Sequence, residues 1–298
     1  MKRAPSLVAL AAAAALALAL ALAPAPARAC TACGCGDPTL TVLGSEQPLA
    51  RRLRAGLGVS SQRETDGTMD LDEQRLSFAA AFDPHQRVSL LLEVPLLRRT
   101  VQYVNLGVKQ VLGVADPELR ARLLLWADRA FAPRHLFSAI AGARLPLTPL
   151  AVDDSGAALP GELQASGGSF APIAGVAYAH FHHPWSEYAS AQATLPLGSR
   201  AGARPSRSLR LTGAVQRQLG TALAARLAVD GRLDGRARES GASDPGSGGA
   251  VAFLSPELLW SPLTDLLLFA SVRLPVVRAF LGAHDEGPVW SAGVLRDF

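Results

Sequence analysis

Three cysteines lie close together near the start of the chain, at Cys30, Cys33 and Cys35. Their spacing, C-x-x-C-x-C, gathers three thiols within a short segment. Thiolates are soft ligands that suit Cu(I) and Zn²⁺. In an oxidising compartment, two of the three would instead form a disulfide and leave one thiol over. The spacing therefore allows a copper or zinc site but does not distinguish it from a disulfide.

The histidines add a second kind of metal ligand. Neutral imidazole binds the same two metals. We expect most histidines to lie on or beside short connections, on the same side of the fold as the cysteines. These residues are His85, His135, His180, His182 and His183. The candidate metal ligands among them are His180, His182 and His183; the alternative is that all five are ordinary residues of interfacial turns.

The first 29 residues have the pattern of a secretory signal peptide. Lys2 and Arg3 precede a long uncharged run rich in Leu and Ala, and a small-x-small cleavage site follows at residues 27–29. A membrane anchor is the alternative, but Pro24 and Pro26 disfavour it. A lipoprotein signal would also end at Cys30, but Arg28 stands where such a signal needs a small residue. We predict a signal peptide at 1–29, a periplasmic segment at 30–49 and one domain at 50–298.

Charge and motifs exclude several functions. Cleavage removes Lys2, Arg3 and Arg28, which lowers the formal charge from +4 to about +1. The high isoelectric point therefore gives no reason to expect a nucleic-acid partner. The sequence holds no G-x-S-x-G, H-E-x-x-H or phosphate-loop motif. We predict a protein that is not an enzyme and has no firm cofactor; an outer-membrane lipid hydrolase is the distant alternative.

The stretch RLAVDGRLD, residues 226–234, places charged residues on one parity and mostly aliphatic residues on the other. That period of two predicts a strand with one polar and one apolar face. Similar segments recur along the chain and predict an all-β fold. The predicted strands are Arg51–Ser60, Arg75–Phe82, Arg87–Arg99, Asp116–Trp126, His135–Leu145, Ser169–Phe181, Ser186–Leu195, Ser208–Gln216, Ala224–Asp234, Ala250–Trp260, Asp265–Val276 and Pro288–Phe298.

Short and long connections alternate between these strands, as in outer-membrane barrels. The short ones include Asp83–Gln86, and the long polar ones include Gln62–Asp72 and Pro146–Gly168. We therefore predict a transmembrane antiparallel β-barrel of about 12 strands, of the outer-membrane type. A pair of soluble β-sandwiches is the alternative. Asp116–Trp126 also has an N-cap, a proline and helix formers, but its alternating charges favour a strand.

Charged residues on the predicted inward faces would line the lumen, because an arginine facing lipid would cost about 2–4 kcal/mol. These residues either form a selective polar pore or fill the lumen with salt bridges, and the sequence favours neither reading. Arg52 falls on the same parity. The lumen candidates are Arg54, Arg75, Glu93, Glu118, Arg120, Arg122, Arg210, Arg226, Asp230, Arg232, Glu257 and Arg273.

The chain ends on Phe298, and Trp290, Ala292 and Val294 share its parity. A terminal aromatic residue on an apolar strand face is the signal that the outer-membrane assembly machinery recognises. Arg296 departs from this pattern, because an apolar residue is expected there. We predict that the assembly machinery and membrane lipid are partners, and that both chain ends lie in the periplasm of a Gram-negative bacterium.

The predicted hairpins resemble the outer-membrane barrels of the MetA-pathway of phenol degradation family. The segments that carry the resemblance are LLLEVPLL at 90–97, VADPELRAR at 114–122, AGARLPLT at 141–148, GGSFAPIAGVAY at 167–178, VAFLSPELL at 251–259 and ASVRLPV at 270–276. The family pattern does not include the N-terminal cysteines. The resemblance implies a porin-like route for a small, aromatic or hydrophobic solute and no catalytic residues. The alternative is a structural or metal-associated barrel that does not conduct.

Overall fold

The computed structural model describes residues 51–65, 69–103, 107–152, 156, 159, 163–199, 203–239, 241–282 and 285–298. The predicted signal peptide and Cys30, Cys33 and Cys35 lie outside these residues. No helix among the described residues is long and apolar enough to cross a membrane.

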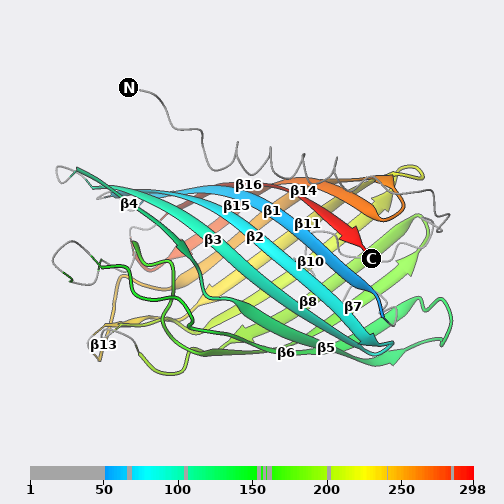
Figure 1. The fold of residues 1–298 in the computed structure, drawn as a ribbon, viewed down its shortest axis with the longest axis horizontal. Coiled ribbons are helices and arrows are strands. Elements are labelled where there is room, and N and C mark those ends of the chain that lie inside the picture. The colour runs from blue at the N-terminus through cyan, green and yellow to red at the C-terminus, as the bar shows by residue number, and fades with distance from the viewer. Residues whose placement is uncertain are drawn as a thin grey trace.

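Antiparallel strands make up most of the described chain (Figure 1). The long ones are β1 Leu53–Thr65, β2 Met69–His85, β3 Val88–Tyr103, β4 Gly107–Val114, β5 Glu118–Ala127, β6 His135–Arg144, β7 Ala171–His182, β8 Trp185–Thr194, β10 Ser208–Gln218, β11 Leu223–Asp234, β14 Gly249–Leu263, β15 Leu266–Phe280 and β16 Asp285–Asp297. A separate small sheet contains β9 Ala203–Arg204, β12 Arg238–Glu239 and β13 Ala242–Ser243.

Twelve of the long strands, all except β4, pair in a ring. β1 pairs with β16, and β2 pairs with both β1 and β3, so the barrel closes on itself. Closure gives each barrel strand a partner on both sides. It therefore leaves no sheet edge whose backbone N–H and C=O groups would lack hydrogen-bond partners in lipid. The predicted twelve-stranded barrel is confirmed, and residues 118–127 form a strand, not a helix.

One predicted connection is wrong, and one predicted strand is longer than expected. The segment Gln62–Asp72 is mostly strand, because β1 continues to Thr65 and β2 begins at Met69. The residues after Arg99 are also not a simple loop, since β3 continues to Tyr103 and β4 pairs with it.

In the extensions of β2 and β3 the apolar residues take the inward parity, where Leu71 and Val101 pack with Leu163. Polar residues such as Asp70 and Gln102 take the outward parity, so the pattern of the barrel strands is reversed there.

β4 and β5 occupy successive parts of the same edge of β3. Leu96 pairs with Val114 of β4, and Glu93 pairs with Glu118 of β5. The residues between, 115–117, interrupt the ladder, although the Ala115 N–H still donates to Pro95 O at 2.7 Å. The pair therefore behaves as one barrel strand with a bulge, which keeps the ring at twelve.

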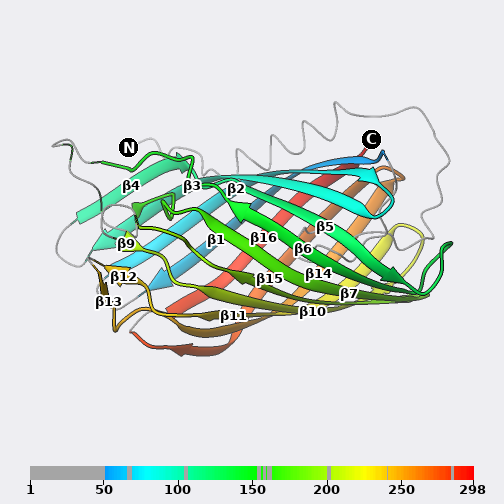
Figure 2. The ribbon, with the colours of Figure 1, turned by 90° about the horizontal axis from the view of Figure 1, so that it is seen from below.

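The barrel has two distinct ends. The turn end holds the start of β1, the end of β16 and the short connections such as 86–87, 183–184 and 264–265. The loop end holds the longer connections, including 145–170 and 235–248. Figures 1 and 2 show tilted strands, with the C-terminus at the turn end and the small sheet at the loop end.

The two faces of each strand differ as the sequence predicts. On β11, Leu227 and Val229 are 51 % and 49 % exposed, whereas Arg226 and Asp230 are buried. The apolar side chains point outward, and the charged ones point into the barrel. An outward apolar surface over many strands suits contact with the hydrocarbon of a bilayer.

The chain end closes the barrel seam. The Phe298 N–H donates to Leu53 O at 2.8 Å, and Arg54 Nε donates to Asp297 Oδ1 at 2.6 Å across β1 and β16. The ring of Phe298 is exposed, and the Arg296 guanidinium lies 5.2 Å above its centroid. This cation–π contact gives Arg296 a role at the position where the sequence suggested an apolar residue.

Candidate functional site

Every predicted lumen residue lies on the inward parity of its strand, but the residues differ in exposure. Arg210 is exposed, although Thr212, Ala214 and Gln216 on the same face of β10 are buried. The buried members are Arg54, Glu118, Arg120, Arg122, Arg226, Asp230 and Glu257. The half-buried members are Arg75, Glu93, Arg232 and Arg273.

The turn-end half of the lumen is packed with paired charges and apolar side chains. Arg226 Nε donates to Glu257 Oε2 at 2.7 Å, and neither side chain is more than 4 % exposed. Arg122 Nη2 donates to Ser89 Oγ at 2.8 Å. An apolar cluster fills the space beside them: Leu136, Ala179, Tyr188, Ala214 and Ala228.

The loop-end half contains arginines that remain open to water. Arg210 lies close enough to Arg144, Arg232 and Arg273, on three other strands, for their charges to interact. Arg144 interacts in the same way with Arg75. The side chains of these four neighbours are 33–43 % exposed. Positive charge from five strands therefore surrounds a part of the lumen that water reaches.

Carboxylates offset much of this positive charge. Arg232 forms ion pairs with Asp234 and Glu286, and Arg273 Nε lies 3.8 Å from Asp230 Oδ2. No carboxylate of the described residues lies within ion-pair distance of Arg210. Of the carboxylates, Asp230 attracts Arg210 from beyond ion-pair distance.

Asp230 links three neighbouring strands through hydrogen bonds inside the barrel. Its carboxylate accepts hydrogen bonds from Thr212 Oγ1 at 3.0 Å and from Ser255 Oγ at 3.2 Å. These two bonds come from the neighbouring strands β10 and β14, so the carboxylate ties three strands together. Both hydroxyls and the carboxylate are buried.

Four of the lumen residues that the structure adds to the predicted set show why sequence reasoning missed them. Arg144 follows the inward parity of β6 and could have been found from the alternation. Thr212 and Ser255 also follow that parity, but they carry no charge to draw attention. Glu286 falls in a segment expected to be a loop.

Arginines also line the mouth of the barrel at the loop end. A cavity of about 270 Å³ lies between the connections before β10 and after β11. Four of its six lining residues are arginines: Arg204, Arg207, Arg236 and Arg238. Positive charge is therefore also concentrated among the connections at this end.

An apolar groove of about 420 Å³ lies beside β4. Val111, Leu112 and Val114 form one side, and Leu147 with Pro149 of the following long connection form the other. Leu112 and Val114 are exposed. This groove is a second surface, distinct from the arginine-lined lumen, that an apolar solute could contact.

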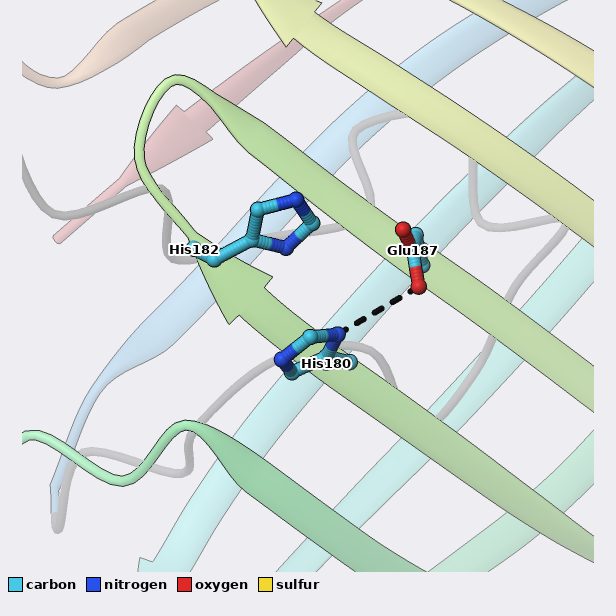
Figure 3. Close-up of side chains that lie close together, drawn as sticks. All are labelled: His180, His182 and Glu187. Atoms are coloured by element: carbon cyan, nitrogen blue, oxygen red, sulfur yellow. Dashed lines mark hydrogen bonds and ion pairs between the residues drawn. The ribbon is translucent and has the colours of Figure 1, made fainter.

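The metal candidates are separated in the structure. His180 and His182 lie on the outward face of β7 at the turn end, together with Glu187 of β8 (Figure 3). His183 is exposed in the β7–β8 turn and is not part of this group. The structure does not describe the cysteines, so no contact between them and the histidines is observed. Glu187 was not predicted as a ligand.

No protein-family model and no curated protein matches the sequence. Solved structures match the fold. An outer-membrane channel from Pseudomonas putida F1 superposes with a TM-score of 0.66 at 12 % identity, covering 84 % of this chain and 96 % of that one. The β-domain of the Bordetella autotransporter BrkA gives 0.50 at 11 %, covering 84 % and 100 %. The P. putida toluene transporter TodX gives 0.41 at 9 %, covering 84 % and 90 %.

At these identities the likeness establishes the fold alone, and the TodX value is too low to carry an argument. The chain is a closed twelve-stranded antiparallel β-barrel, the fold that the outer-membrane channel shares. Its membership of the phenol-degradation family stays a prediction.

Proposed function

We propose that this protein is an outer-membrane channel for small solutes and that its arginine-lined half favours anions. The observation that carries the proposal is the exposure of Arg210 inside a closed barrel. Accessible surface on an inward side chain means unfilled space beside it inside the barrel, although burial within the barrel still desolvates the Arg210 guanidinium. The similarity to an outer-membrane channel supports the same conclusion at the level of architecture.

Charge gives the solute class. A passage lined by one sign of charge raises the local concentration of ions of the opposite sign, and rings of arginine favour anions in pores. The arginines at the loop-end mouth extend this lining. A small organic anion fits it best, and an aromatic carboxylate would also satisfy the aromatic solute that the family resemblance implies. The apolar groove beside β4 favours the hydrophobic alternative.

The orientation and partners follow the general outer-membrane pattern. The loop end faces the exterior, and both chain ends lie in the periplasm, because long loops are external in such barrels. The outward apolar face contacts lipid, and Phe298 serves as the signal for the assembly machinery. The ring of Phe298 is exposed and directly follows the end of β16, which supports this role.

A second candidate function is a barrel that does not conduct. The observation that favours it is the turn-end half, where the Arg226–Glu257 pair and the apolar cluster fill the lumen. Such a barrel would serve a structural role. Both candidates agree on the fold and differ only in whether this half leaves a continuous path.

Planar-bilayer recording of the purified full chain separates the candidates. We expect discrete currents and, in a potassium chloride gradient, a reversal potential that indicates preference for chloride. Arg210→Gln should reduce this preference, while Arg217→Gln on the outward face of β10 should leave it unchanged. A silent wild type, combined with currents in the Arg226→Ala, Arg232→Ala double variant, would instead establish the filled barrel.

Vesicle uptake of three compounds of similar size then tests the solute class. We expect benzoate to enter faster than phenol and benzylammonium to enter slowest. Phenol entering fastest would favour the hydrophobic alternative and the groove beside β4.

A further inference from the structure

A compact group of metal-ligating side chains lies outside the lumen, on the outer wall of the barrel at the turn end. The ligand atoms of His180, His182 and Glu187 all lie within 4.8 Å of one another. His180 Nδ1 is 3.3 Å from Glu187 Oε2. Among the described residues, no other group of three histidine, cysteine or acidic side chains meets this criterion.

The local strand geometry builds this group. His180 and His182 are two residues apart on β7, so both side chains project from the same face. Glu187 is the direct partner of His180 in the β7–β8 register, which places their side chains side by side. The two-residue connection at 183–184 fixes that register, so the three side chains converge as Figure 3 shows.

The spacing suits a tetrahedral cation. Zinc bonds of about 2.0–2.1 Å in tetrahedral geometry place two ligand atoms about 3.3–3.5 Å apart. The observed distance between His180 Nδ1 and Glu187 Oε2 falls in this range. The ring of His182 stacks on that of His180, with centroids 4.7 Å apart, so it must turn toward the other two ligands to complete the set. Two histidines and one glutamate are a known zinc ligand set that leaves a fourth position open.

His182 supplies the observation that an ordinary ion pair does not explain. Its Nδ1 atom is buried and has no hydrogen-bond partner among the described residues. In Figure 3 a ring nitrogen of His182 faces the space between His180 and Glu187. A hydrogen bond between His180 and Glu187 leaves that nitrogen unsatisfied, and such groups need a partner. A cation held by all three residues would provide one.

Neighbouring aromatic groups hold the site in place. The ring of His135 stacks on that of His180, with centroids 4.3 Å apart and planes at 3°. His135 Nδ1 lies 2.7 Å from the hydroxyl of Tyr178. These contacts fix the His180 ring plane, as second partners of metal ligands commonly do. His135 and Tyr178 are therefore positioning residues.

We propose that His180, His182 and Glu187 bind a divalent transition-metal cation, Zn²⁺ or Cu²⁺, at the rim of the barrel. Imidazole suits both ions, and the carboxylate adds the negative charge that such a site needs. The site does not require the cysteines, and it is independent of conduction through the lumen. Three protein ligands would leave a fourth position for water or another ligand.

Isothermal titration of the purified full chain with ZnCl₂, after removal of metal with a chelator, tests the proposal. We expect one Zn²⁺ per chain. His182→Gln and Glu187→Gln should each weaken binding roughly tenfold or more. His85→Gln is the matched control, because His85 lies at another turn and accepts a hydrogen bond from the Arg87 N–H. It should bind like the wild type.

Two further measurements keep the test decisive. Heat-modifiable gel mobility shows whether each variant folds, and the wild type loaded with Co²⁺ should give the intense visible absorption of a tetrahedral site. The proposal is overturned if the wild type retains no Zn²⁺ or if folded His182→Gln binds equally well. It is also overturned if binding disappears only when Cys30, Cys33 and Cys35 are changed to serine.

Discussion

The two halves of the lumen use the same residue type in opposite ways. Arg226 of β11 is fully buried against Glu257, whereas Arg210 of the neighbouring strand β10 is exposed and lacks an ion-pair partner among the described residues. Both side chains point inward. The difference depends on position along the barrel, since Arg226 lies near the turns and Arg210 near the loops.

This contrast separates stability from selectivity. A buried arginine must have its partner, because the low-dielectric surroundings make an isolated charge costly. An arginine in contact with water contributes little to stability, but its field acts on passing ions. The turn-end half therefore stabilises the barrel, and in the proposed channel the loop-end half selects solutes by their charge.

The largest predicted effect concerns the buried pair. Arg226→Ala removes the cation that neutralises the buried Glu257 carboxylate, which should destabilise the barrel by about 3–5 kcal/mol. Urea titration in detergent, followed by the loss of heat-modifiable mobility, measures this change. The double change Arg226→Met, Glu257→Leu should recover most of the stability, because it removes both charges together.

Arg210→Ala is the matched comparison. Because this side chain is exposed and forms no ion pair among the described residues, the free energy of unfolding should change by no more than about 0.5 kcal/mol. Equal losses for Arg226→Ala and Arg210→Ala would remove the distinction between the two halves.

A second, smaller effect comes from the apolar cluster. Tyr188 is only 3 % exposed and packs among Leu136, Ala179 and Ala214, with Phe181 edge-on at 6.0 Å. Tyr188→Ala should cost about 3 kcal/mol, as other aromatic truncations do. It should also widen the turn-end half and raise the single-channel current. An unchanged current in a folded variant would mean that the narrowest point lies elsewhere.

The sequence predicts the barrel but not this division. Alternation reveals which face of β11 carries Arg226 and Arg232, because the lipid face excludes charge. It says nothing about which of them is buried, since that depends on side chains from strands distant in the sequence. For example, Arg232 of β11 forms an ion pair with Glu286 of β16.

The outward cluster shows a related limit. The spacing of His180 and His182 is visible in the sequence, but Glu187 becomes their neighbour only through the β7–β8 register. Conversely, the extensions of β1 and β2 escaped prediction because their polar residues resemble a loop. Their backbone pairing continues, as between Arg63 and Asp72, and Met69 and Leu71 of β2 pack in an apolar cluster.

The smallest predicted effect tests whether the turns themselves anchor the stable half. The Asp128 carboxylate accepts hydrogen bonds from the backbone N–H groups of Arg134 and His135, at 2.8 and 3.0 Å, and closes the β5–β6 connection. The hydrogen bond from the His135 N–H lowers the pKa of Asp128 below its ordinary value of 3.8. The hydrogen bond from the Arg134 N–H lowers this pKa further, whereas desolvation raises it in part.

A carboxyl whose pKa is lower in the folded state stabilises that state above the ordinary pKa. The stabilisation is lost as the pH falls through the lowered value. NMR titration of the Asp128 carboxyl should therefore give a midpoint below 3.8, and Asp128→Asn should remove most of the local pH dependence between that midpoint and neutral pH. Because this carboxyl is only partly buried and lies in a turn, the change in the free energy of unfolding should be small beside that of Arg226→Ala. A midpoint at or above 3.8 would mean that the turn contributes nothing, and that the buried pair and the apolar cluster alone stabilise this half of the barrel.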